Sequence, residues 1–176
     1  MIILITQQEK IILNNLQPHT NLKELDINGY LGTKFPEWLE DLTFYILVSL
    51  QLNGYKLPPL RQLPMLKELQ VSEYEGLVSV GYEFLGNKIS FVTNCFLALE
   101  ILRIEYMSSW EKWYPNVENA GNGAFYRLRE FQIKNCPKLT RDLPGNLPSL
   151  TLLVISYCKH LLSLLPKSPT LHVLDI

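Results

Sequence analysis

The amino-acid sequence predicts an α/β repeat solenoid, in which every repeat adds one short strand to a parallel sheet. Three features lead to this prediction: an apolar hexamer that returns along the chain, strand periodicity within the hexamer, and prolines between its copies. The chain has 176 residues and a net charge of −1, so it can bury one sizeable core and carries no charge excess that would favour a nucleic-acid partner.

The repeated hexamer has the form L-x-x-L-x-(I/L/V), with Phe131 in place of the middle leucine in one copy. Its copies begin at Leu22, Leu47, Leu66, Leu99, Leu128, Leu150 and Leu171. Successive copies lie 19 to 33 residues apart, which overlaps the period of about 20–29 residues that is typical of leucine-rich repeats. The sequence therefore predicts an irregular leucine-rich-repeat horseshoe, with a parallel concave β-sheet and a convex side of loops, 3₁₀ turns and short helices.

Each copy has the alternation of a strand that is buried on one face. If the first leucine is position 1, the apolar residues at positions 4 and 6 lie two apart and point to the same side of a strand. The residues at positions 3 and 5 then point to the opposite side. One repeat cannot bury its own leucines, but stacked repeats can, with parallel strands about 4.8 Å apart.

The copies also suggest how the chain is organised. We interpret residues 1–20 as a partial repeat or convex helix that precedes the first full repeat, and residues 21–176 as a leucine-rich-repeat domain of seven strands. The last copy stops at Ile176 without a polar cap, so we expect a domain that is truncated at its C-terminus.

The clearest helical segment is residues 8–19. Here Ile12, Leu13 and Leu16 recur on one helical face, and Pro18 is expected to end the helix. Elsewhere prolines interrupt the segments between copies, as in "KLPPLRQLP" and "CPKLTRDLPGNLP", which disfavours regular helix on the convex side.

Two repeats carry long insertions, at residues 80–96 and 108–125. The second includes a tip rich in glycine and asparagine. We expect both to be surface loops, with a specific contact loop as the alternative interpretation.

Position 9 of the repeat is expected to turn inward, towards the stack. Its residues are Tyr30, Tyr55, Tyr74, Met107, Cys136 and Cys158. Regular repeats place Asn or Cys here. Because aromatic residues occupy half of this column, we expect irregular turns after the strands.

The three cysteines do not form a disulfide framework or a CxxC motif. Cys136 and Cys158 share position 9 of adjacent repeats, and we expect them to be small buried apolar residues. A metal or redox pair is the alternative, disfavoured because no histidine or carboxylate cluster completes a site. The low cysteine count, the absence of an N-glycosylation sequon and the lack of a signal peptide favour an intracellular, cytoplasmic setting.

No constellation of catalytic residues occurs in the sequence. The histidines His19, His160 and His172 are scattered, and no phosphate-binding GxxxxGK[ST] loop is present. The stretch "GNGAF" is a single GxG without further glycines. We therefore expect no enzyme activity, no cofactor and no metal site.

The concave strand positions are the more informative place to look for function. Positions 3 and 5 give the predicted protein-binding residues: Glu24, Asp26, Ser49, Gln51, Glu68, Gln70, Ile101, Arg103, Glu130, Gln132, Leu152, Val154 and Val173. The early part of this surface is polar and acidic, whereas the late part is aliphatic. An apolar patch with a polar rim favours a protein contact, although further repeats or a terminal cap could also cover it.

Several longer strings carry a family resemblance. "NLQPHTNLKELDINGYLGTKFPEWL", "LPPLRQLPMLKELQVSEYEGLVSVGYEFLG", "MSSWEKWYPN" and "LREFQIKNCPKLTRDLPGNLPSLTLLVISYCKHLLSLLP" resemble the repeat region of plant nucleotide-binding leucine-rich-repeat disease-resistance proteins, in particular their coiled-coil class. The resemblance runs from about residue 10 to the end of the chain. Arg61 departs from it, since the family usually has glycine there.

The resemblance implies a non-catalytic protein-recognition region of an intracellular immune receptor. Its expected partners are a pathogen effector or a host protein and, in a full-length receptor, its own nucleotide-binding domain, which it would hold inactive. No nucleic-acid partner and no membrane span are expected. The alternatives are an extracellular receptor-like leucine-rich-repeat ectodomain and the substrate-adaptor repeats of a ubiquitin ligase.

Overall fold

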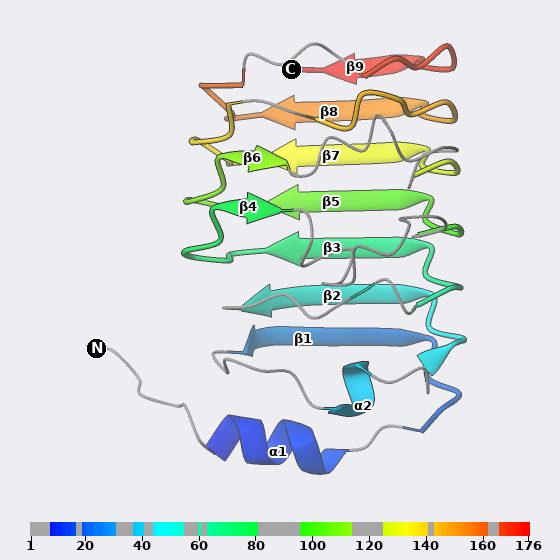
Figure 1. Cartoon of the computed structure of the whole chain (residues 1–176), viewed down its shortest axis with the longest axis vertical. Helices are drawn as coiled ribbons and strands as arrows, with labels where there is room; N and C mark the ends of the chain where they lie inside the picture. The colour runs from blue at the N-terminus through cyan, green and yellow to red at the C-terminus, as the bar shows by residue number, and fades with distance from the viewer. Residues whose placement is uncertain are drawn as a thin grey trace, which may run out of the picture.

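The computed structural model of the chain describes residues 8–16, 19–30, 37–40, 44–54, 60, 63–80, 96–113, 125–140, 143–161 and 166–176. Its strands are stacked one above another, from β1 beside the N-terminal helix to β9 at the other end (Figure 1). The elements are α1 (Gln8–Leu16), β1 (Glu24–Tyr30), α2 (Glu37–Glu40), β2 (Ser49–Gly54), β3 (Glu68–Ser72), β4 (Ser79–Val80), β5 (Ile101–Glu105), β6 (Lys112–Trp113), β7 (Glu130–Lys134), β8 (Leu152–Ser156) and β9 (Val173–Asp175).

The seven repeat strands form one parallel sheet in the order β1-β2-β3-β5-β7-β8-β9. Equal repeat positions pair with one another, so that position 4 runs through Leu25, Leu50, Leu69, Leu102, Phe131, Leu153 and Leu174. This arrangement confirms the predicted leucine-rich-repeat solenoid and its strand positions. The short helix α2 follows β1 in the chain and lies on the side of β1 that faces α1 (Figure 1).

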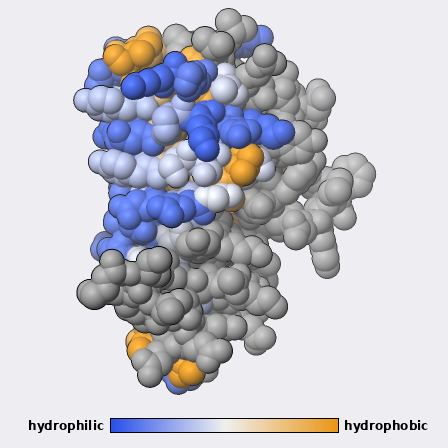
Figure 2. All heavy atoms as spheres, turned by 90° about the vertical axis from the view of Figure 1, so that its left-hand side faces the viewer, coloured by the Kyte–Doolittle hydropathy of each residue, from blue (hydrophilic) through white to orange (hydrophobic). Residues whose placement is uncertain are grey.

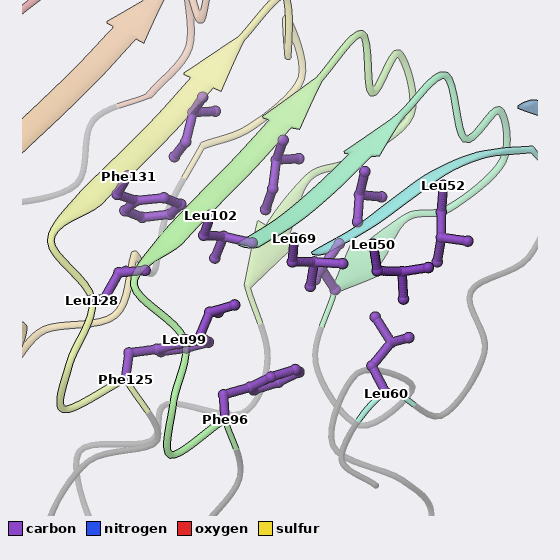
Figure 3. Packing of buried hydrophobic residues seen from close by; sticks show 14 of the residues in the cluster. Leu50, Leu52, Leu60, Leu69, Phe96, Leu99, Leu102, Phe125, Leu128 and Phe131 are labelled. Carbon is purple, nitrogen blue, oxygen red and sulfur yellow. The ribbon is translucent and has the colours of Figure 1, made fainter. Parts of the chain in front are cut away.

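The core lies directly behind the sheet. Leu50, Leu69, Leu102 and Phe131 project from neighbouring strands in one row (Figure 3), and each is fully buried. Three residues before the first leucine of the second to sixth copies, a second row of buried side chains closes the layer. This row consists of Phe44, Leu63, Phe96, Phe125 and Leu147.

Each member of this second row also fixes the turn that leads into the next strand. Its carbonyl accepts a hydrogen bond from the N–H of the first leucine, for example at 3.0 Å between Leu47 and Phe44 and at 3.2 Å between Leu128 and Phe125. The same residue therefore fills the core and sets the entry angle of the strand. That double role explains why large apolar side chains recur at this spacing.

The turns after the later strands are regular, contrary to our expectation. Glu73, Tyr106, Asn135 and Tyr157 all occupy position 8 with φ between 54° and 60°. The N–H groups of Tyr106 and Asn135 donate to the carbonyls of Lys134 and Ser156, both at 2.9 Å. These bonds extend the strand ladder into the turn, so the backbone repeats although the side chains vary.

Position 9 faces the stack, as predicted. Tyr30, Tyr74, Met107 and Cys136 are buried, and Cys158 is half-buried. Tyr55 lies outside the described residues. The Tyr74 hydroxyl has no hydrogen-bond partner among the described residues, and burial raises the pKa of Tyr74.

The N-terminal helix is present as predicted but makes less contact with the core than expected. α1 spans Gln8–Leu16, and Pro18, which was predicted to end the helix, lies outside the described residues. Of the three predicted apolar residues, only Leu13 packs against the core, and Ile12 and Leu16 are exposed. The Leu13 carbonyl accepts a hydrogen bond of 2.9 Å from the Trp38 indole, which ties α1 to α2.

Most of the two insertions lies outside the described residues. Their described ends form a small parallel sheet of β4 and β6 that the sequence analysis missed. Trp113 in β6 contacts Phe125 and Phe131, with ring centroids 5.8 and 6.1 Å apart. The tryptophan thus connects this second sheet to the core of the first.

Core burial decreases at the two ends of the sheet. Leu153 is fully buried in β8, whereas Leu174, at the same repeat position in β9, is 44% exposed. Leu25 in β1 is half-buried. Among the described strands, β1 and β9 each pair with a neighbour on one side only, so fewer side chains of the sheet pack against theirs.

Replacing one residue of β8 tests the register. We expect Leu153→Asp to lower the free energy of unfolding by about 4 kcal/mol or more, because it buries an unpaired charge. Leu152→Asp places the same charge on the opposite face and should cost about 1 kcal/mol or less. Urea denaturation monitored by circular dichroism measures both. Equal losses would contradict the assigned register.

Substitutions at two glycines test backbone strain and steric conflict separately. Gly29 has φ +70° and open space where a Cβ would lie, so Gly29→Ala should cost about 1 kcal/mol through conformation alone. At Gly54 a Cβ would lie 2.3 Å from the Tyr30 carbonyl oxygen. Gly54→Ala forces the backbone to shift and should cost about 2–3 kcal/mol. Thermal unfolding compares the two variants, and a larger loss at Gly29 would refute this explanation.

Candidate protein-binding surface

We define the open face as the side of the seven-stranded sheet opposite the core. The alternating burial of β2, β3, β5, β7 and β8 directs every second side chain to this face. Its first column is Glu24, Ser49, Glu68, Ile101, Glu130, Leu152 and Val173. Its second column is Asp26, Gln51, Gln70, Arg103, Gln132, Val154 and Asp175. The structure therefore brings all the predicted surface residues together, and Asp175 completes the second column.

The two columns differ in exposure along the stack. Glu24, Asp26 and Val173 are exposed, and the predicted residues of the strands between them are half-buried. The half-burial arises because neighbouring side chains in a column flank each other on both sides. The open face is therefore a closely packed surface and not a row of separate side chains.

An ion-pair network occupies the middle of the open face. The Arg103 guanidinium donates to Glu68 through Nη1, and to Glu130 Oε1 through Nη2 at 2.8 Å and Nε at 3.1 Å. Gln132 Nε2 donates to the same oxygen of Glu130 at 2.7 Å. Three strands, β3, β5 and β7, are thus connected by side chains as well as by backbone.

The charges of this network affect one another. Burial lowers the pKa of the Arg103 guanidinium, but the hydrogen bond to Glu68 and the attraction of Glu130 outweigh it and raise the pKa. One arginine therefore serves two carboxylates. Lys134 approaches Glu105 at 3.5 Å and Lys67 approaches Glu100 at 3.2 Å, which places further ion pairs beside the network.

Position 7 of the repeat supplies a third column of surface residues, which was not predicted from the sequence. Glu105 and Lys134 belong to it, together with Asn53 and Ser156. The signal was present in the sequence, because the alternation of positions 3 and 5 continues for two more residues. Ser72 occupies the same position but is buried.

The two ends of the open face have different chemistry. At the β1 end, Glu24 and Asp26 carry negative charges, and neither has an ion-pair partner within the described ranges. At the other end, Leu152, Val154 and Val173 are aliphatic, and Leu152 lies directly opposite Val173 in the register. The open face therefore changes from acidic to apolar along the stack.

A cavity opens at the C-terminal edge of the strands. Its volume is about 470 Å³, and it is lined by Gly29, Asn53, Gly54, Glu73, Glu75, Tyr106 and Ser108. Figure 2 shows this edge, where hydrophilic residues lie in successive rows. The cavity was not predicted, because it depends on the turn geometry at position 8, which the hexamer does not encode.

The described residues contain no cluster of three or more His, Cys, Asp or Glu side chains able to hold a metal ion. None of the described helices is long and apolar enough to cross a membrane. Cys136 and Cys158 lie together in the stack, whereas His19, His160 and His172 lie in separate turns.

Comparisons with known proteins agree with this architecture. The family model described as "R13L1/DRL21 LRRs" matches residues 5–74. The disease resistance RPP13-like protein 1 of Arabidopsis thaliana is 36% identical to this chain. The match covers 87% of this chain and 15% of the relative's own length. Disease resistance protein RGA2 of Solanum bulbocastanum is 32% identical over 86% of this chain and 16% of its own length. No solved structure matches the chain.

The parallel sheet and its repeated hexamer place the chain among the leucine-rich-repeat proteins. Within that class, the chain is a leucine-rich-repeat region of the kind found in plant disease-resistance proteins. These are the nucleotide-binding leucine-rich-repeat proteins of innate immunity. The chain spans only 11% to 16% of the length of three of these relatives.

Replacing Arg103 tests whether the network stabilises the fold. Arg103→Met should lower the free energy of unfolding by about 1–2 kcal/mol, because two partly buried carboxylates lose their shared partner. Lys67→Met breaks a more exposed pair and should cost about 0.5 kcal/mol or less. Urea unfolding at low and high salt measures both. Equal, small losses would show that the network contributes nothing to stability.

Proposed function

We propose that this region recognises other proteins through its open face, as the non-catalytic recognition part of an intracellular plant immune receptor. Its partners are a pathogen effector or a host protein and, within a full-length receptor, the nucleotide-binding domain that it holds inactive. The observation that carries the proposal is the alignment of fourteen side chains into two columns on one continuous surface.

The geometry of the columns supports a macromolecular partner. Stacked strands lie about 4.8 Å apart, so seven of them present a surface roughly 30 Å long. A small molecule would contact only a few of these residues, whereas a folded protein can cover all of them. The relatives are named for disease resistance, which supports perception in a defence response.

The two ends of the open face suggest how a partner is oriented. The carboxylates of Glu24 and Asp26 favour a basic segment at the β1 end through charge complementarity. Leu152, Val154 and Val173 favour an apolar segment at the other end. A partner bound in the reverse direction would leave both its charges and its apolar surface unmatched. The change from acidic to apolar side chains along the open face therefore sets the orientation of the partner.

The chemistry of the open face supports recognition over catalysis. Glu68 and Glu130 both bind Arg103, so their carboxylates are already engaged. A general base needs a free carboxylate within reach of a substrate in a desolvated site. The surface of an open sheet offers little desolvation.

A double substitution tests the proposed surface. Leu152→Asp with Val154→Asp should weaken partner binding by roughly thirtyfold or more, since losing a central apolar contact costs about 2 kcal/mol. Met65→Asp with Leu97→Asp is the matched control, because both residues are exposed apolar side chains in the turns before β3 and β5. Calorimetric titration against the receptor's nucleotide-binding domain and against candidate effectors measures the affinities.

Thermal unfolding of both double variants shows that they are folded before binding is compared. Equal loss of affinity in the two variants, or no loss in either, would contradict a binding surface at the apolar end of the open face. Loss in the control variant alone would move the contact to the turns before the strands.

A further inference from the structure

Two thiols meet inside the stack, in the turns that follow β7 and β8. Cys136 and Cys158 are free cysteines at the same position of adjacent repeats. Lys134 pairs with Ser156 at the ends of the two strands, and the Asn135 N–H continues the ladder with a bond of 2.9 Å to the Ser156 carbonyl. The backbone therefore holds the two cysteines side by side.

This spacing is compatible with a covalent bond between the sulfurs. Neighbouring parallel strands lie about 4.8 Å apart, and a disulfide joins residues whose Cα atoms are about 4.4–6.8 Å apart. The two side chains are close enough for each to affect the pKa of the other. Cys158 Sγ also lies 3.4 Å from the Ser156 carbonyl and 3.8 Å from the Ile133 carbonyl, which holds it against the end of β7.

The two thiols differ in access and in acidity. Cys136 is fully buried and donates to the Lys134 carbonyl at 3.3 Å, whereas Cys158 is half-buried. The interaction with the Cys136 side chain lowers the pKa of Cys158, despite the opposing effect of burial. The same interaction, together with burial, raises the pKa of Cys136. Cys158 is therefore the more exposed and the more acidic of the two thiols.

We propose that Cys136 and Cys158 form a thiol-oxidation site, in which Cys158 is oxidised by a peroxide and Cys136 then closes a disulfide between adjacent repeats. The Cys158 thiolate attacks hydrogen peroxide, breaks the O–O bond, and becomes a sulfenic acid with release of hydroxide. The Cys136 sulfur then attacks the sulfenic sulfur, and the departing oxygen leaves as water with the Cys136 proton. The peroxide is reduced by two electrons, and the two thiols are oxidised by two electrons.

The position of Cys136 makes the second step possible. The pairing of Lys134 with Ser156 and the hydrogen bond from the Asn135 N–H keep Cys136 beside Cys158 while the sulfenic acid exists. A reductant of the thiol class reverses the bond by exchange. The proposal is independent of the proposed binding function, because it concerns thiols beneath the turns and not the open face.

The site also differs from a purely apolar column. Met107 precedes Cys136 at the same repeat position and is fully buried, as a packing role requires. Cys158 is half-buried and hydrogen-bonded through its sulfur. If both cysteines only filled space, they would resist oxidation and would not join.

The test uses the full chain with Cys95→Ser, so that Cys136 and Cys158 are the thiols present. After treatment with an equimolar amount of hydrogen peroxide, intact mass spectrometry should show the loss of two hydrogen atoms. Peptide mapping should then recover a Cys136–Cys158 disulfide within the monomer, and dithiothreitol should restore both thiols. Unchanged thiols, or a disulfide between two copies only, would overturn the proposal.

Single variants assign the two roles. In Cys136→Ser, a dimedone probe should trap the sulfenic acid at Cys158 at least tenfold faster than it labels Cys136 in Cys158→Ser. Thermal unfolding of both variants serves as the folding control, and Cys136→Ala replaces a variant that fails to fold. Equal labelling of the two cysteines, or faster labelling at Cys136, would contradict the assigned order of reaction.

Discussion

The in-register backbone ladder between neighbouring strands is the interaction on which every other feature depends. From β2 to β9, each repeat position pairs with the same position of the next strand. That register gathers the leucines into a core, arranges the polar side chains in columns and places two cysteines side by side. A slip of one residue would exchange the two faces of a strand, exposing Leu102 and burying Arg103.

The exception to the register shows how strictly it is maintained elsewhere. Between β1 and β2 the pairing shifts. Tyr30 comes opposite Gly54 and not opposite residue 55, which has the same repeat position as Tyr30. The close approach of the Tyr30 carbonyl leaves no room for a Cβ at residue 54. The shift is therefore confined to a place where glycine allows it, and the pairing of β2 with β3 is regular again.

The strands and the open face could be predicted because the hexamer is a local signal with a fixed period. Positions 4 and 6, such as Leu69 and Val71, identify the core side, and positions 3 and 5 then follow by alternation. These strand features depend on which side of a strand a residue lies, and that property is encoded in the sequence itself. The inward column at position 9 was predicted differently, from the repeat template and the inward turn of the chain after the strand.

Features that depend on contact between repeats could not be predicted in this way. Glu68, Arg103 and Glu130 are far apart in the sequence, and only the register shows that one guanidinium reaches both carboxylates. The β4–β6 pairing joins two dipeptides that are too short to have a periodicity. The left-handed conformation at Tyr106 and Tyr157 was unexpected, because bulky residues rarely adopt it without a ladder to hold them.

The open face consists of residues under two different constraints. Arg103, Glu68 and Glu130 already satisfy one another, so a partner that covered them would gain little and would have to preserve their hydrogen bonds as water is removed. Glu24, Asp26, Leu152 and Val154 lie outside this network, and core packing does not determine their identity. Substitutions at these four residues can change the chemistry of the surface without weakening the register. Under the proposed function, the central network keeps the surface rigid and the two ends select the partner.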